Sequence, residues 1–155
     1  MSTQLSPPDR VAALLSGLIG KPIGVRVAPT KTASLPTALA IAVYGGEGQA
    51  AGAWLCDMAS ASSLAAALSL LPPAVAKEAV SAGKLDEPLL ENLREIFNVG
   101  ARLFQSDRHV SLKGVFLPGQ ALPAPVTNLL KSTKRAEFEV GVPGYANGRT
   151  WLLLP

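Results

Sequence analysis

Apolar and polar residues follow two different periods along this chain, and the periods predict where helices and strands lie. Apolar positions three and four residues apart are typical of a helix with one buried face, whereas short apolar runs with period two are typical of strands. Three substantial helices are predicted at residues 9–19, 58–71 and 87–106, with a short helical piece around 75–82. Six strands are predicted at residues 23–28, 37–44, 49–56, 110–117, 136–142 and 149–154.

Capping residues and prolines mark the ends of these elements. Ser6 or Asp9 is the expected cap of the first helix, and Asp57 or Ser60 that of the second, because short polar side chains accept hydrogen bonds from a helix's first N–H groups. Residues 118–125 contain three prolines, which predicts a loop.

The order of elements predicts the fold class. Two pairs of strands follow each other closely enough to form hairpins, the first around Gly45-Gly46-Glu47-Gly48. Hairpins mixed with helices indicate a mainly antiparallel sheet with helices packed on it. We therefore expect a two-layer α/β domain with about six strands, occupying residues 1–155 as a single domain.

Composition narrows the class of protein. The chain has 155 residues, of which 48% are hydrophobic and 16% charged, and this excludes a disordered chain. No apolar run approaches the roughly 20 residues needed to span a bilayer, and the first residues do not resemble a signal peptide, so a cytoplasmic protein is expected. One cysteine, Cys56, excludes an internal disulfide, and no cysteine cluster is present to hold a metal. Aromatic residues make up only 5% and the net charge is only +3, which argues against nucleic-acid binding.

The third helix carries the most informative polar residues. At about 100° per residue, Glu91, Glu95, Asn98 and Arg102 lie at relative angles of about 0, 40, −20 and 20°, which is one ridge about 60° wide. The apolar residues of the same segment centre on the opposite side. An ordinary surface helix also has a polar ridge, and Glu95 paired with Arg102 or with its neighbours is the simpler interpretation. Asn98 weakens that interpretation, because asparagine is a poor choice for a helix selected for stability alone.

The segment LDEPLLENLREIFNVGARLF, residues 85–104, resembles the active helix of the CheC/CheX family of chemotaxis phosphatases. In that family the helix carries Glu-x-x-Asn followed by small residues, and here Glu95 and Asn98 match. The order of elements resembles the family over most of the chain. A single Glu-x-x-Asn is similar to CheX rather than to two-site CheC.

The resemblance implies removal of phosphate from the aspartyl-phosphate of a CheY-like response-regulator receiver domain. Asn98 would orient the attacking water, and Glu95 would engage the receiver's lysine. Glu91 and Arg102, on the same ridge, would contact the partner. The protein would need no cofactor of its own, since the receiver would supply Mg²⁺. The resemblance also implies a homodimer, and the apolar closing strand at residues 151–154 is a candidate edge for it.

The chain departs from the family pattern in three respects. Glu91 stands where the family usually has Asp or Ser, and the family's proline beyond the helix has no counterpart. The stretch between Asn98 and the next predicted strand is also several residues shorter than in the family. The alternative function is therefore a non-catalytic binding or scaffold module, as in the related middle domain of flagellar switch proteins.

Three other features have simpler interpretations. The glycine-rich segment at 45–48 lacks the Lys-Ser/Thr ending of a phosphate-binding loop and is interpreted as a turn. Cys56 and His109 are the only cysteine and the only histidine, so they are the only candidates for a catalytic Cys/His pair. A cysteine buried as a small hydrophobic residue is the commoner case. Trp54 and Trp151 lie in predicted strands and are expected in the core.

Overall fold

The computed structural model describes residues 5–30, 34–105 and 109–155. The strands are β1 (Gly24–Val27), β2 (Leu39–Gly46), β3 (Gln49–Asp57), β4 (Ser111–Phe116), β5 (Arg135–Gly141) and β6 (Gly148–Leu153). The helices are α1 (Pro8–Ile19), α2 (Met58–Leu68), α3 (Pro73–Ala82), α4 (Glu87–Val99) and α5 (Ala124–Leu130), and a 3₁₀ helix η1 (Gly100–Phe104) continues α4.

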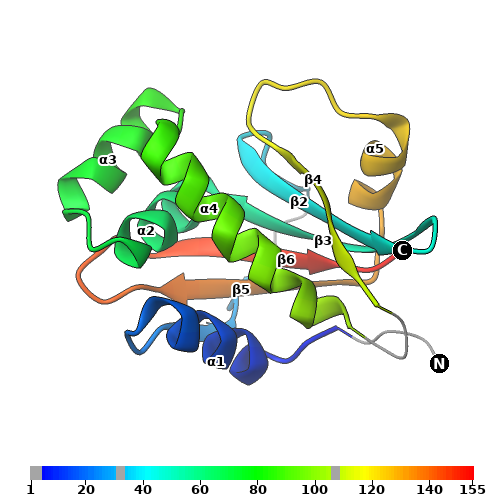
Figure 1. The fold of residues 1–155 in the computed structure, drawn as a ribbon, viewed down its shortest axis with the longest axis horizontal. Coiled ribbons are helices and arrows are strands. Elements are labelled where there is room, and N and C mark those ends of the chain that lie inside the picture. Colours follow the sequence, from blue (N-terminus) through cyan, green and yellow to red (C-terminus); the bar gives the residue numbers. More distant parts are fainter. Residues whose placement is uncertain (1–4, 31–33, 106–108) are drawn as a thin grey trace.

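All six strands form one sheet in the order β1-β5-β6-β3-β2-β4, and every neighbouring pair is antiparallel. Helices α1, α2 and α4 cover one face, with α4 running diagonally across the molecule (Figure 1). The larger apolar core lies between these helices and the sheet. The predicted α/β class with about six mainly antiparallel strands is confirmed.

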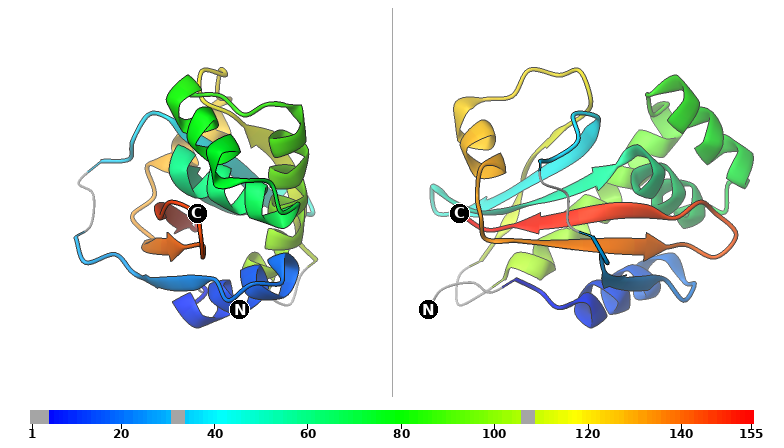
Figure 2. Two further views of the ribbon diagram at one scale, coloured as in Figure 1. Left: turned by 90° about the vertical axis from the view of Figure 1, so that its left-hand side faces the viewer. Right: turned by 180° about the vertical axis from the view of Figure 1, so that it is seen from behind.

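The opposite face of the sheet has a smaller cover. Helix α5 lies on this side, as the view from behind shows (Figure 2). Its buried residues Val126 and Leu129 pack with Ile41, Leu55 and Trp151 in a second apolar cluster. The two-layer prediction therefore describes the α4 side, and α5 adds a partial third layer.

The helix caps agree with the sequence at α2 but not at α1. The Ser60 N–H donates to Asp57 Oδ1 at 2.8 Å, so Asp57 caps α2 as predicted. The prediction of Ser6 or Asp9 as the cap of α1 is wrong, because Pro7 holds that position and forms no side-chain cap. Ser6 instead donates to the Leu103 carbonyl at 2.8 Å and ties the start of α1 to η1.

Prolines explain the one helix that the sequence prediction missed. The segment 118–125 is a loop only in its first part, because α5 begins at Ala124. Pro123 is the N-cap and Pro125 lies in the first turn, where the missing N–H has no helical partner to lose. Prolines that seemed to exclude a helix therefore mark its start.

The first hairpin turn is tighter than predicted. Strands β2 and β3 extend to Gly46 and Gln49, which leaves Glu47 and Gly48 as a two-residue loop. Both loop residues have positive φ, 51° and 77°, as in the turns that suit the twist of antiparallel strands.

The prediction that residues 151–154 form a dimer edge is wrong. They belong to β6 and its end, and β6 pairs with β5 on one side and β3 on the other. Its backbone groups are used inside the sheet, since strand order places β1 and β4 at the edges. The prediction of a homodimer itself stays untested.

Candidate functional site

Helix α4 begins where the sequence predicts. Asp86 is its N-cap and accepts a hydrogen bond from the Leu89 N–H at 3.2 Å, and Pro88 lies in the first turn. The buried residues Leu89, Leu93, Ile96 and Phe97 define one face, which packs toward the sheet. The other face is therefore left to solvent.

The buried face of α4 is fixed by close contacts with the sheet. The Tyr44 hydroxyl donates to the Phe97 carbonyl at 2.6 Å, and the Trp54 and Phe97 rings meet edge to face with centroids 5.3 Å apart. A Cβ placed on Gly100 would lie 2.6 Å from the Trp54 ring and 2.7 Å from the Tyr44 hydroxyl oxygen. Glycine at position 100 thus permits the close approach of helix and sheet.

The flank of α4 is fixed to α2. The Asn92 amide donates to the Ala65 carbonyl at 2.9 Å and to Ser69 Oγ at 2.6 Å. Together with the contacts to the sheet, these bonds determine which side of α4 faces outward.

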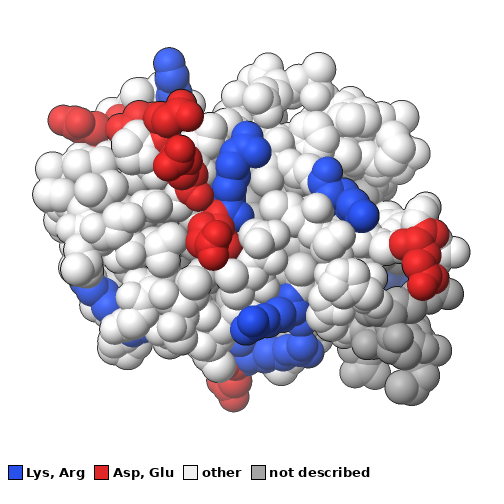
Figure 3. Space-filling view, in the orientation of Figure 1, with Lys and Arg blue, Asp and Glu red and all other residues white. Residues whose placement is uncertain are grey.

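The outward side carries the residues that the sequence singles out. Glu91, Glu95, Asn98 and Arg102 are all exposed. Acidic side chains follow the course of α4 across this face of the molecule (Figure 3). Within the described ranges, the Glu95 and Asn98 side chains form no hydrogen bond or ion pair, so the simpler interpretation of a Glu95–Arg102 pair does not hold.

The ridge changes direction after Asn98. The predicted helix over 87–106 is α-helical only to Val99 and then 3₁₀ through Phe104, while Ser106 lies outside the described residues. The tighter winding, 3.0 instead of 3.6 residues per turn, rotates Arg102 by about 40° from the angle that a continuous α-helix gives. Arg102 therefore lies beside α1 instead of continuing the ridge.

A groove of about 660 Å³ separates α1 from this end of α4. It is lined by residues that the sequence analysis did not select, together with Arg102: Arg10, Ala13, Leu14, Gly17, Leu18 and Val99. The available sequence signal was the pair of small residues Ala13 and Gly17, one turn apart on the outer side of α1. Val99 and Arg102, across the groove, come more than 80 residues later in the chain and cannot be found from local patterns.

The Cys56 thiol is not arranged for nucleophilic catalysis. It is fully buried, and burial raises its pKa to about 12, with hydrogen bonds from Thr150 and Ser60 opposing that rise. The thiolate is the nucleophilic form and is scarce at neutral pH when the pKa is so high. His109 is exposed, whereas Trp54 and Trp151 are buried, as expected for core residues.

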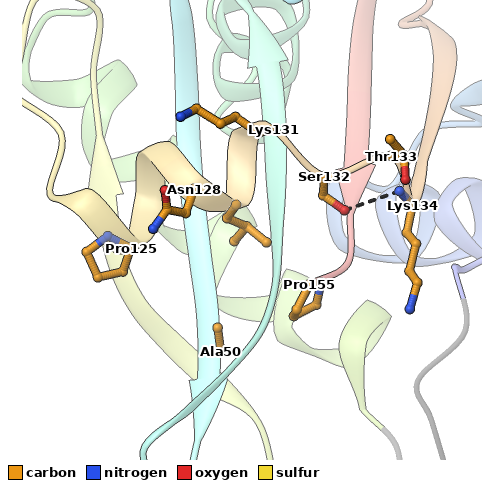
Figure 4. A pocket seen from close by; sticks show the side chains of 9 residues that line it. Ala50, Pro125, Asn128, Lys131, Ser132, Thr133, Lys134 and Pro155 are labelled. Carbon is orange, nitrogen blue, oxygen red and sulfur yellow. Dashed lines mark hydrogen bonds between the residues drawn. The ribbon is translucent and has the colours of Figure 1, made fainter.

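A second hollow, of about 480 Å³, lies beside α5 and the chain's last residue (Figure 4). Its polar lining includes Asn128, Lys131, Ser132 and Lys134. Ser132 is already engaged, because its hydroxyl donates to the Leu154 carbonyl and accepts from the Lys134 N–H. The described hydrogen bonds of the Ser132 hydroxyl are thus to backbone groups and not to a lysine side chain.

The parts of the chain that the structure describes contain neither a candidate metal site nor a helix that could span a membrane. No group of three or more His, Cys, Asp or Glu side chains in these parts could hold a metal ion. No helix among residues 5–30, 34–105 and 109–155 is long and apolar enough to cross a membrane.

Fold and site together define an α/β protein with a polar helix exposed over an antiparallel sheet. No protein-family model matches the sequence, and no curated protein matches it. Solved structures do share the fold. A chain of the FliM–SpeE complex from H. pylori superposes with a TM-score of 0.66 and 9% identity, over 96% of this chain and 81% of that one.

FliY from Thermotoga maritima superposes with a TM-score of 0.55 and 16% identity, over 93% of this chain and 81% of that one. A looser match, with a TM-score of 0.47 and 13% identity over 94% and 93% of the two chains, is to a chain of the CheX–CheY–BeF₃–Mg²⁺ complex from Borrelia burgdorferi. The FliM and FliY structures establish that this chain has the α/β fold of those proteins.

Proposed function

We propose that the protein removes phosphate from the aspartyl-phosphate of a CheY-like receiver domain and that Glu95 and Asn98 are its catalytic residues. The observation that carries this proposal is the placement of the two side chains. They are one turn apart on the exposed side of α4 and have no partner among the described residues, and the opposite side of the helix is fixed to the sheet. Side chains at this spacing have Cβ atoms about 5–6 Å apart, so one partner site can contact both.

The chemistry suits these residue types. Phosphoryl transfer depends mainly on positioning and charge stabilisation, with little covalent help from the protein. The Asn98 amide is neutral and can hold a water beside an anionic phosphoryl group, where a second carboxylate would be repelled. Glu95 is suited to an ion pair with the receiver's lysine. Mg²⁺ would arrive with the receiver, so this chain needs no metal site of its own.

The remaining ridge residues would contact the same partner. Glu91 precedes Glu95 by one turn on the exposed side, and Arg102 follows Asn98 at the groove. A partner that reaches Asn98 from solvent has to lie over one or both of them. We place this encounter in the cytoplasm, where receiver domains and their phosphatases act.

The alternative is a non-catalytic binding module in chemotaxis or two-component signalling. It is supported by the FliM structures, which include complexes of FliM with SpeE and with FliG. In this interpretation the same exposed surface holds a partner without hydrolysing anything.

Phosphate release separates the two functions. We would incubate the protein with Mg²⁺-loaded, phosphorylated receiver domains and compare wild type with Asn98→Ala and Glu95→Ala. The matched controls are Asn128→Ala in α5 and Glu78→Ala in α3, which remove the same side chains from exposed helix positions elsewhere. We expect Asn98→Ala to lower kcat, Glu95→Ala mainly to raise KM, and the controls to behave as wild type. Wild type that binds a receiver without accelerating phosphate release would favour the binding module.

A further inference from the structure

The groove between α1 and the end of α4 has an apolar floor. Leu14 and Leu18 of α1 and Val99 of α4 line it and are only half-buried. Gly17 lines it as well, and a Cβ added there would meet no atom within 4 Å. The groove is therefore open, and the chain's own side chains do not fill it.

The rim of the groove is basic. Arg10 and Arg102 are both exposed there, and one Arg10 N–H donates to the Arg102 carbonyl at 2.6 Å. A guanidinium has five N–H donors, so most of those on Arg10 stay available. Within the described parts of the chain, neither arginine forms an ion pair. Two unpaired guanidiniums above apolar side chains suit an occupant that is apolar on one side and acidic on the other.

A basic patch lies beyond the end of α4 on this face (Figure 3). Acidic side chains follow α4 itself, although α4 also carries the exposed Arg94. Val99 and Arg102 follow Asn98 within four residues, which is about 6 Å along a helix axis. A partner with its reacting group at Asn98 therefore extends over the groove.

We infer that the groove receives an amphipathic helix of the receiver-domain partner, with apolar side chains on Leu14, Leu18 and Val99 and acidic side chains at Arg10 and Arg102. This inference rests on the proposed function and names its docking surface. A helix in a groove between two helices is a common mode of recognition, with apolar anchors on one face. Acidic side chains on that helix would complement the two arginines of the rim.

Binding can be measured apart from catalysis. We would titrate wild type and variants with receiver domains carrying Mg²⁺ and beryllofluoride, a stand-in for the phosphoryl group, and follow fluorescence anisotropy. Gly17→Phe fills the groove, and Arg10→Glu reverses one rim charge. The controls are Ala74→Phe and Lys77→Glu, which make the same kinds of change at exposed positions of α3. Far-ultraviolet circular dichroism checks that every variant is folded.

We expect Gly17→Phe and Arg10→Glu each to raise Kd by about tenfold or more, and both controls to stay within about twofold of wild type. Phosphate release from the phosphorylated receiver is measured in parallel. Weakened binding by the groove variants supports the inference whether or not phosphate is released. Binding without release would contradict the phosphatase proposal alone.

Two results would overturn the inference. If both groove variants bind and dephosphorylate the receiver as wild type does, the groove is not the docking surface, although the phosphatase proposal stands. If wild type binds no receiver in a panel from its own organism, the inference and the proposed function both fail.

Discussion

Helices α1 and α4 flank the same groove, but the glycines at positions 17 and 100 have very different surroundings. The buried side of α4 is fixed by the Tyr44 hydrogen bond to the Phe97 carbonyl and by the contact of Gly100 with Trp54. The outer side of α1 presents small residues, and the space in front of Gly17 is open. A helix that positions a water has to be immobile, whereas a helix that lines a docking groove has to leave room. Substitutions at the closely packed Gly100 and at the open Gly17 test this difference between the two helices.

The largest effect is expected at the tightly packed glycine. In Gly100→Ala the new methyl group would lie 2.6 Å from the Trp54 ring, which is fully buried and packs against Phe97. Overpacking of this kind costs about 1–3 kcal/mol, more than alanine's helix propensity returns. Urea denaturation should therefore show a lower free energy of unfolding. An unchanged value would mean that α4 is not held closely against the sheet.

Loss of the Tyr44 hydrogen bond is expected to lower the free energy of unfolding somewhat less than Gly100→Ala does. Tyr44→Phe leaves the buried Phe97 carbonyl without its donor, at a cost of about 1–2 kcal/mol at neutral pH. Burial, followed by the nearby Cys56 thiolate charge, raises the pKa of Tyr44 well above its ordinary value. Above about pH 10 the unfolded chain loses this phenolic proton while the folded protein keeps it, so wild type loses stability as the pH rises.

Tyr44→Phe has no phenol and cannot lose stability by this route. The difference in free energy of unfolding between wild type and Tyr44→Phe should therefore narrow above about pH 10. Urea denaturation of both proteins at a series of pH values checks the expectation. A difference that stays constant or widens would show that Tyr44 ionises at least as readily in the folded protein as in the unfolded chain.

The open glycine should give a small effect of opposite sign. Gly17→Ala adds a methyl group where nothing lies within 4 Å, within a helix and without a positive φ. Replacing a helical glycine by alanine stabilises by about 0.5–1 kcal/mol. A rise in the urea midpoint is expected, and a fall would show that the groove is closed at this position.

Sequence periodicity was sufficient to predict α4 and its exposed side. Its cap, its first-turn proline and its four buried apolar residues are all local features of the sequence. The change to a 3₁₀ helix after Val99 was not predictable in this way. It occurs where Gly100 meets Tyr44 and Trp54, residues more than 40 positions away in the chain.

The groove was missed for the same reason. Arg10 and Arg102 come together only because strand order places α1 beside the end of α4. The error on the closing strand is similar, since 151–154 is as apolar as an exposed dimer edge could be, yet its place between β5 and β3 depends on long-range pairing. Helix α5 was missed for a local reason, because prolines in a first turn look like those of a loop.

The central claim is that Asn98 on α4 positions a water for dephosphorylation, and phosphate release tests it most directly. The measurement compares the decay of a phosphorylated, Mg²⁺-loaded receiver domain alone, with wild type, and with Asn98→Ala. Because Asn98 is exposed, the substitution should change the free energy of unfolding by less than about 0.5 kcal/mol, so lost activity would not reflect lost structure. We predict that wild type accelerates the decay and that Asn98→Ala does not. Equal acceleration by both proteins would contradict the role of Asn98, and no acceleration by wild type with any receiver of its organism would contradict the phosphatase function.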